Sequence, residues 1–166
     1  MFFIRTAQET DLEKLRDLLV ETWRETYAPF HGFAKIDALI EGWHALPAIK
    51  ARLNRPDAEF LVADSGAYMG GMAYAAMSRR EPKTANLNQL YVHPLWQRQG
   101  IGSDLFAEIE TCFPDAEKLR LEVTEENDRA IDFYTAHGMS VVGRTDNAGS
   151  GGSGIPALIM EKKLAF

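Results

Sequence analysis

A chain of 166 residues, 46% of them hydrophobic, can bury one sizeable core, so we expect a single domain over residues 1–166. The net charge of −6, with 18 Lys and Arg spread along the chain, argues against nucleic acid as a partner. No apolar run approaches the ~20 residues of a membrane span, and Arg5 comes too early for a signal peptide, so we expect a cytoplasmic protein that does not bind membranes. Cys112 is the only cysteine, which excludes an internal disulfide and a cysteine-based zinc site, and we expect no metal.

The first segment with a clear pattern is an apolar run from Phe2 to Ala7, which predicts a strand. Thr10 and Glu13 follow at the spacing of a capping box, in which each side chain satisfies a backbone donor at the start of a helix. Leucines then recur at helical spacing, and Pro29 predicts that this helix ends near Tyr27.

A second helical tract covers Ile36 to Leu53, with interruptions expected at Gly42 and Pro47. Later in the chain, runs with strand and helix patterns alternate. The expected strands are Glu59–Asp64, Ala67–Met77, Ala85–Val92, Leu119–Val123, Met139–Gly143 and Ile155–Leu164, and the expected helices are Ser103–Phe113 and Asp128–His137.

Glycines mark three further places where the backbone needs freedom. Ser65-Gly66 separates two strand patterns and indicates a β-hairpin. Gly70-Gly71, inside the second of these strands, indicates a bulge or the close approach of another backbone. The segment Asn147–Gly154 contains four glycines and two serines, which predicts a mobile loop between two paired strands.

The most informative stretch is the one in which a strand, ending at Val92, leads into a glycine turn that opens a helix. Gly100 and Gly102 have no Cβ to keep a ligand away, and the first N–H groups of the helix lack intrahelical partners, so they can bind an anion. The turn has neither the third glycine of a dinucleotide site nor the lysine of a P-loop, which disfavours both kinds of nucleotide-binding module. Taken alone, it fits an anion site or a tight connection. His93, just before Pro94, is predicted to stabilise the bend.

Two blocks of sequence resemble the GNAT (GCN5-related) N-acetyltransferases. Gln97-Arg98-Gln99-Gly100-Ile101-Gly102 resembles their Q/R-x-x-G-x-G/A signature for acetyl-coenzyme A. The second block matches the family's pattern in spacing and consists of Leu121-Glu122-Val123, Asn127, Ala130, Phe133-Tyr134 and His137-Gly138-Met139. The resemblance implies an α/β (α+β) fold with the order βααβββαβαββ. Its central sheet is twisted, mixed and mostly antiparallel, with six or seven strands flanked by about four helices.

The resemblance also implies how acetyl-coenzyme A is held as co-substrate. Its pyrophosphate lies on the N–H groups of Gln99, Gly100, Ile101, Gly102 and Ser103, flanked by Gln97 and Arg98. Leu90 and Val92 lend backbone groups to the pantetheine arm, and an N–H of Tyr91 or Val92 could bind the thioester oxygen as it becomes an oxyanion. From the residues alone, Arg98 could also be an ordinary surface charge, and the side chains of the strand could be plain core.

Tyr134 is the candidate for the acid that protonates the departing thiolate. It follows Asn127 by seven residues, which places both on nearly the same face of one helix, with Asn127 near the pantetheine. An unperturbed phenol has a pKa of about 10 and is protonated at neutral pH, so it has a proton to give. Pattern alone would place Tyr134 in the core and make Asn127 the N-cap of its helix.

The general base is less well defined by the resemblance. Many relatives carry a glutamate early on the strand before the glycine turn, where this chain has Asn86, and asparagine cannot accept the proton. Glu122 corresponds in register to the glutamate that ribosomal-protein alanine N-acetyltransferases use as base. The alternatives are an ordered water as base, and a Glu122 that only hydrogen-bonds a neighbouring strand.

These observations predict an acetyl-coenzyme A dependent N-acetyltransferase that acts directly on a primary amine of a small molecule or a peptide. A coenzyme A-binding sensor or pseudoenzyme without turnover is the alternative. The acidic composition favours cationic amines, and the aromatic residues around His31 and His44 could shape an amine site, although Trp23 continues the leucine stripe and fits a core. Homodimers occur in the family, and the sequence leaves the oligomeric state open.

Overall fold

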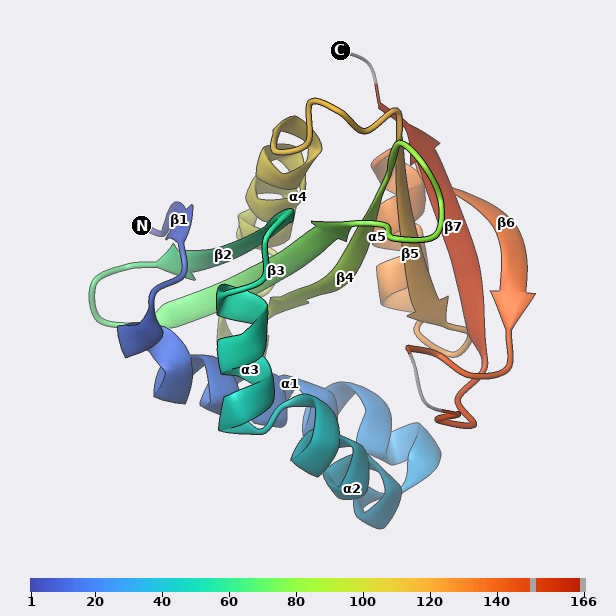
Figure 1. Cartoon of the computed structure of the whole chain (residues 1–166). Coiled ribbons are helices and arrows are strands. Elements are labelled where there is room, and N and C mark those ends of the chain that lie inside the picture. The colour runs from blue at the N-terminus through green and yellow to red at the C-terminus, as the bar shows by residue number, and fades with distance from the viewer. Residues whose placement is uncertain (150–151, 165–166) are drawn as a thin grey trace. The chain divides into compact units, whose positions relative to one another are not determined.

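The computed structural model describes residues 1–149 and 152–164. Its seven strands form one mixed sheet in the order β1-β2-β3-β4-β5-β7-β6, which confirms the predicted fold class (Figure 1). The strands are β1 (Phe3–Thr6), β2 (Ala58–Asp64), β3 (Met69–Met77), β4 (Thr84–Val92), β5 (Lys118–Thr124), β6 (Ser140–Thr145) and β7 (Ala157–Lys163). The helices are α1 (Leu12–His31), α2 (Phe33–Trp43), α3 (Leu46–Leu53), α4 (Ile101–Thr111) and α5 (Asp128–Ala136).

The chain divides into two compact units. The first unit contains Met1–Ala75 and Gln89–Cys112, and the second contains Ala76–Asn88 and Phe113–Phe166. Strands β3 and β4 therefore each contribute residues to both units. Of the predicted loop Asn147–Gly154, Ser150 and Gly151 lie outside the described residues.

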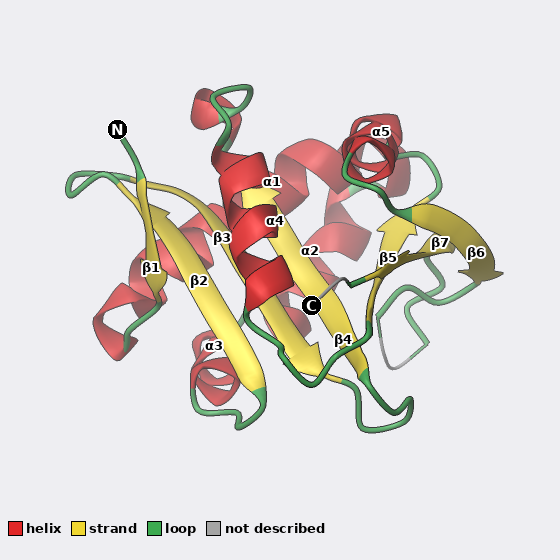
Figure 2. Cartoon of the chain, turned by 90° about the horizontal axis from the view of Figure 1, so that it is seen from above, coloured by secondary structure: helices red, strands yellow, loops and turns green. Residues whose placement is uncertain are grey.

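The first unit is built from β1, β2, most of β3, the end of β4 and four helices. Strands β1 and β2 pair antiparallel, from Phe3↔Asp64 to Thr6↔Leu61. Helix α1 contacts α2 and α3, whereas α3 and α4 contact β2. Figure 2 shows α4 crossing one face of these strands, while α1 and α2 lie on the opposite face. The apolar stripe of α1 is thus buried, with Leu15 and Leu19 fully inaccessible to solvent.

The predicted capping box of Thr10 and Glu13 is wrong. The residue that precedes α1 is Asp11, and its carboxylate accepts the backbone N–H of Gln8 at 2.8 Å. The same carboxylate accepts two N–H groups of Arg5, at 2.8 and 2.9 Å, and this pairing lowers its pKa. The guanidinium on β1 therefore sets the start of the helix, because a charge-assisted bidentate pair is stronger than a neutral cap.

Helix α1 also extends beyond the predicted end near Tyr27. It includes Pro29 and ends at His31, where Gly32 takes φ +84° and donates its N–H to the carbonyl of Ala28 at 2.8 Å. A proline in the last turn removes only one backbone hydrogen bond, which the buried inner face of the helix can offset.

The tract predicted from Ile36 to Leu53 forms two helices, α2 and α3. They are separated at His44 and Ala45, between the two expected interruptions, and Pro47 occupies the first turn of α3, where a missing N–H costs little. The chain therefore has five helices among its described residues, one more than expected.

At Gly70 and Gly71 other groups approach the backbone of β3 closely. Of the two predicted alternatives, a bulge or a close approach, the structure shows the close approach. A Cβ added to Gly71 would lie 2.8 Å from the carbonyl oxygen of Tyr91 on β4. A Cβ added to Gly70 would lie 2.6 Å from the ring of Phe2. The first unit therefore packs β3 against β4 at a separation that only glycine allows at position 71.

The second unit contains the start of β4, together with β5, β6, β7 and α5. The parallel pairing joins Thr84–Leu87 of β4 to Lys118–Leu121 of β5. Strand β7 lies between β5 and β6 and pairs antiparallel with both. Its buried residues, Ala157 and Met160, form part of a core with Leu119 and Leu121 of β5.

Candidate active site

The glycine turn precedes α4 in the first unit. Gly100 takes the left-handed conformation, with φ +84°, and α4 begins at Ile101, two residues earlier than predicted. Ile101, Gly102 and Ser103 are therefore the first residues of the helix, and they precede Asp104, whose N–H donates to the carbonyl of Gly100 at 3.0 Å. A Cβ built on Gly100 would meet nothing within 4 Å, so the space in front of this turn is open. The turn has the shape and polarity of an anion site.

Arg98 is also in the left-handed region, with φ +64°. This conformation costs a residue with a Cβ about 1–2 kcal/mol, and such strain tends to gather at functional sites. The Arg98 side chain is exposed, as the adjacent Gln99 and Gly100 are. Gly100 is left-handed as well, and left-handed residues are a component of anion-binding nests.

The strain at Arg98 leads to a prediction with two readouts. Arg98→Gly and Arg98→Ala both remove the guanidinium, but only glycine adopts φ +64° without strain, so the glycine variant should be the more stable by about 1 kcal/mol. Both variants should bind coenzyme A about 2- to 5-fold more weakly, as expected for one exposed ion pair. Chemical denaturation and calorimetric titration measure the two effects. Equal stabilities of the two variants would show that the backbone at position 98 is not strained. Unchanged affinity for coenzyme A in both would show that the Arg98 guanidinium does not contribute to binding.

Hydrogen bonds tie the segment before the turn to β4 and to α1. The Gln97 side chain donates from Nε2 to the carbonyl of Val92 at 3.1 Å, which ties Gln97 to the strand. Leu95 donates its N–H to His93 Nδ1 at 3.2 Å, which confirms that His93 stabilises the bend. His93 Nε2 lies 2.5 Å from a carboxylate oxygen of Glu21 on α1. Because Nδ1 accepts the N–H of Leu95, the ring proton lies on Nε2, which donates to Glu21.

The strand residues assigned to the pantetheine arm are half-buried at the end of β4. Side chains alternate along a strand, so Tyr91 leaves one face while Leu90 and Val92 leave the other. The Tyr91 ring lies 6.5 Å from that of Trp23, against the cluster of α1 and α2. In that cluster Trp23 and Tyr27 are buried, at 7% and 9% exposure, which confirms the prediction that Trp23 packs in the core.

In the second unit, α5 carries the residues of the second sequence block. Asn127 is the N-cap of this helix, and its Oδ1 accepts the N–H of Ala130 at 3.2 Å. Tyr134 is 8% exposed, and its ring lies 5.3 Å from that of Phe133 in an edge-to-face arrangement. The structure therefore confirms the capping function of Asn127 and the burial of the Tyr134 ring.

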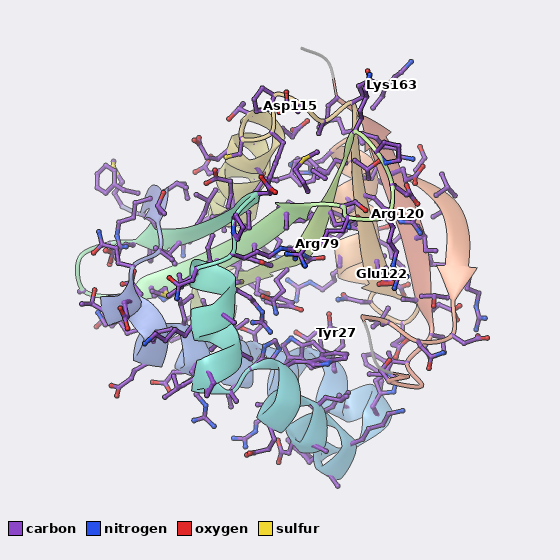
Figure 3. All side chains as sticks on the ribbon, viewed as in Figure 1. Tyr27, Arg79, Asp115, Arg120, Glu122 and Lys163 are labelled. Atoms are coloured by element: carbon purple, nitrogen blue, oxygen red, sulfur yellow. The ribbon has the colours of Figure 1, made fainter. Side chains whose placement is uncertain are left out.

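Glu122 lies on β5 in the second unit and is exposed. Its side chain leaves the same face of the strand as that of Arg120, and both are labelled in Figure 3. The carboxylate accepts the N–H of Gly149 at 3.2 Å. Glu122 lies opposite Ile159 in the register of β5 and β7.

The other carboxylates beside this part of β5 are neutralised. Glu81 pairs with Arg120, and both Glu81 and Glu161 contact Lys118, at 3.3 and 3.2 Å. Glu122 pairs with no cation in the part of the chain that the structure describes. Asn86, the position at which many relatives have a glutamate, lies opposite Arg120 in the parallel pairing.

Cys112 is unsuited to nucleophilic catalysis. Burial raises the pKa of its thiol to about 11, and the thiol donates to the carbonyl of Glu108 at 3.2 Å. Nucleophilic cysteines need a depressed pKa because the thiolate is the reactive form. Within residues 1–149 and 152–164, no group of three or more His, Cys, Asp or Glu side chains could hold a metal ion. No helix there is both long and apolar enough to span a membrane.

Sequence reasoning missed three residues close to the candidate site. Glu21, Arg52 and Gln89 belong to no sequence motif. Each of them forms a hydrogen bond to a residue far away in the chain. The helical spacing of Glu21 and Arg52 indicated only that their helices exist. Glu21 is 72 residues away from its partner His93, and Arg52 is 37 residues away from its partner Gln89. No local pattern encodes such pairs.

A model of the acetyltransferase (GNAT) family matches residues 12–139. The chain is similar to the PaiA N-acetyltransferase from Thermoplasma acidophilum, solved in complex with coenzyme A, with 25% identity, a TM-score of 0.84, and 98% of this chain and 99% of that chain covered. A search of the curated proteins found no match.

Two further structures are similar in fold. A GCN5-related N-acetyltransferase from Rhodopseudomonas palustris has 19% identity and a TM-score of 0.80 over 99% of this chain and 96% of that chain. The ribosomal-protein-S18-alanine N-acetyltransferase from Escherichia coli has 20% identity and a TM-score of 0.71 over 100% of this chain and 96% of that chain. Since the family model matches well over half of the sequence, the chain belongs to the acetyltransferase (GNAT) family and is an acetyl-coenzyme A dependent acetyltransferase.

Proposed function

We propose that this chain transfers an acetyl group from acetyl-coenzyme A directly to a primary amine of a small molecule or a peptide. The observation that carries the proposal is the open, left-handed turn at Gly100 in front of the first N–H groups of α4. The similar Thermoplasma protein was solved in complex with coenzyme A, which supports coenzyme A as the ligand of this chain.

In this proposal the backbone N–H groups of Gln99, Gly100, Ile101, Gly102 and Ser103 bind the pyrophosphate. Arg98 adds a cation beside them, and the Gln97 side chain holds the turn to Val92. Leu90 and Val92 bind the amides of the pantetheine arm through their backbone, as an added strand would. Asn127 offers its side-chain N–H₂, since its Oδ1 is used by the cap of α5.

The proposed chemistry forms one C–N bond and breaks one C–S bond. The neutral amine attacks the thioester carbonyl, and an N–H of Tyr91 or Val92 stabilises the oxyanion. As the C–S bond breaks, Tyr134 gives its proton to the departing thiolate, while Glu122 takes a proton from the amine. Direct attack is favoured over a covalent acetyl-enzyme because Cys112 has a raised pKa.

Release of free thiol from acetyl-coenzyme A, measured over a panel of primary amines and short peptides, tests this function. The proposal expects release that depends on both substrates and an acetylated amine as product. Calorimetric binding of coenzyme A without release for any amine would support the sensor instead. Competition by ATP or NAD would indicate a nucleotide-binding module.

The base is tested by Glu122→Gln. Loss of the proton acceptor should lower kcat at neutral pH about 100-fold, within the range of general acid-base catalysis. Glu161→Gln is the matched control, because Glu161 lies on the adjacent strand and pairs with Lys118 at 3.2 Å. Full activity of Glu122→Gln would assign the proton to an ordered water.

A further inference from the structure

Arg52, on α3 in the first unit, is half-buried and has no carboxylate partner among the described residues. It donates to the backbone carbonyl of Trp43 and, at 3.4 Å, to Oε1 of Gln89 on β4. Burial lowers its pKa, and both hydrogen-bond acceptors are neutral groups. By contrast, Arg5, Arg24, Arg120 and Arg144 all pair with a carboxylate.

Two buried ring side chains, His44 and Trp23, lie in the same part of the first unit as Arg52. Burial and, secondly, the charge of Arg52 lower the pKa of His44 to about 3, so this ring is neutral. Both ring nitrogens of His44 are buried, and the ring lies 5.0 Å from that of Trp23. The indole N–H of Trp23 is buried and unpartnered. Unpaired buried donors are rare and costly, so this cluster is incomplete without an acceptor of hydrogen bonds.

The cluster lies beside the strand that the proposed function assigns to the reactive arm. Gln89, which contacts Arg52, and Tyr91, which contacts Trp23, flank Leu90 on β4. The guanidinium is thus one hydrogen bond away from the strand along which the thioester would be held. A group bound by Arg52 would belong to a molecule that lies against this strand.

A carboxylate fits these donors better than other ligands. A planar guanidinium binds a carboxylate through two parallel hydrogen bonds, and one unit of negative charge balances the single cation. A phosphate would bring more charge than Arg52 balances, and His44 is neutral. A polyamine would place a second cation beside Arg52 and would be repelled.

We propose that Arg52 binds a carboxylate of the acetyl acceptor, so that the acceptor is an amino acid or another small molecule with both a primary amine and a carboxylate. This inference rests on the proposed function. It selects a different acceptor class from the cationic amines that the acidic composition favoured.

Matched pairs of acceptors test the inference, because the members of each pair differ only in the carboxylate. Tyrosine against tyramine and lysine against cadaverine are suitable pairs, with thiol release as the assay. The wild type should prefer the carboxylate member by about 10- to 100-fold in kcat/KM, the range of a hydrogen bond to a charged group. Arg52→Gln should reduce this ratio to near one, and the KM for acetyl-coenzyme A serves as a check on the donor site.

Gln89→Glu is a second variant that keeps Arg52 in place. The new carboxylate would form an ion pair with the Arg52 guanidinium inside the protein. The preference for acceptors with a carboxylate should therefore disappear again, and this test remains available if Arg52→Gln fails to fold. Lys50→Gln is the control, because Lys50 is exposed on the same helix and pairs with Glu9 at 2.8 Å, and it should leave the ratio unchanged.

The possible results are distinguishable. A wild type that prefers tyramine and cadaverine overturns the inference while leaving the proposed function standing. So does a preference that survives in both Arg52→Gln and Gln89→Glu. Faster turnover of O-phosphoethanolamine than of every amino acid would show that Arg52 binds a phosphate and not a carboxylate. Absence of thiol release with any amine would contradict the proposed function itself.

Discussion

Replacing Tyr134 by phenylalanine should lower kcat by about 100-fold or more while changing the KM for acetyl-coenzyme A little, because we propose that the phenol protonates the leaving thiolate and does not hold the bound donor. The ring is 8% exposed, so phenylalanine fills the same buried space and only the hydroxyl is lost. Steady-state thiol release at saturating acceptor measures the effect.

Tyr68→Phe is the matched control for this experiment. Tyr68 loses the same hydroxyl from a side chain that is 59% exposed, and it should retain wild-type kcat. A Tyr134→Phe variant that keeps full kcat across the pH range would show that the thiolate leaves without this acid.

Replacing Gly71 by alanine should destabilise the protein by about 3 kcal/mol, at the upper end of the range for an overpacked site. The added Cβ would lie 2.8 Å from the carbonyl oxygen of Tyr91, 3.0 Å from Ile101 and 3.2 Å from Leu105. A backbone carbonyl cannot rotate away as a side chain can, so the strands must separate. Thermal unfolding should show a fall in Tm of roughly 10 °C.

Gly70→Ala provides the comparison within the same strand. Its nearest neighbour is the ring of Phe2, 2.6 Å from the added Cβ, and this ring can turn aside. The Gly70 variant should therefore lose clearly less stability than the Gly71 variant. The reverse order would show that the close approach of Tyr91 does not limit the packing of β3.

Local pattern predicted most of the elements, because strands and amphipathic helices are encoded by neighbours in the sequence. It failed at both ends of α1. The start of the helix depends on Arg5, which comes from another element, and its end depends on buried contacts that outweigh the proline at position 29. Propensity and capping rules describe isolated helices, whereas these ends are decided by tertiary partners.

In the candidate site, too, some residues could be predicted from local motifs, whereas others depend on partners that are distant in the sequence. Gly100, Asn127 and Tyr134 belong to contiguous motifs, so their elements could be predicted from spacing, and Gly100 and Asn127 open helices as expected. The lack of a carboxylate beside Arg52 could not be predicted in this way. An unpaired charge becomes visible only when every neighbour in space is known, and the neighbours of Arg52 come from β4 and α2.

The place of β7 in the sheet has a consequence for biosynthesis. It is translated after β5 and β6, yet it lies between them and is the strand with which β6 pairs. Until β7 leaves the ribosome, β5 lacks one of its two partners, and β6 lacks the strand with which it pairs, so its backbone edge is unprotected. A chaperone that shields this region during synthesis would therefore act on β6, and stalling before β7 should increase aggregation.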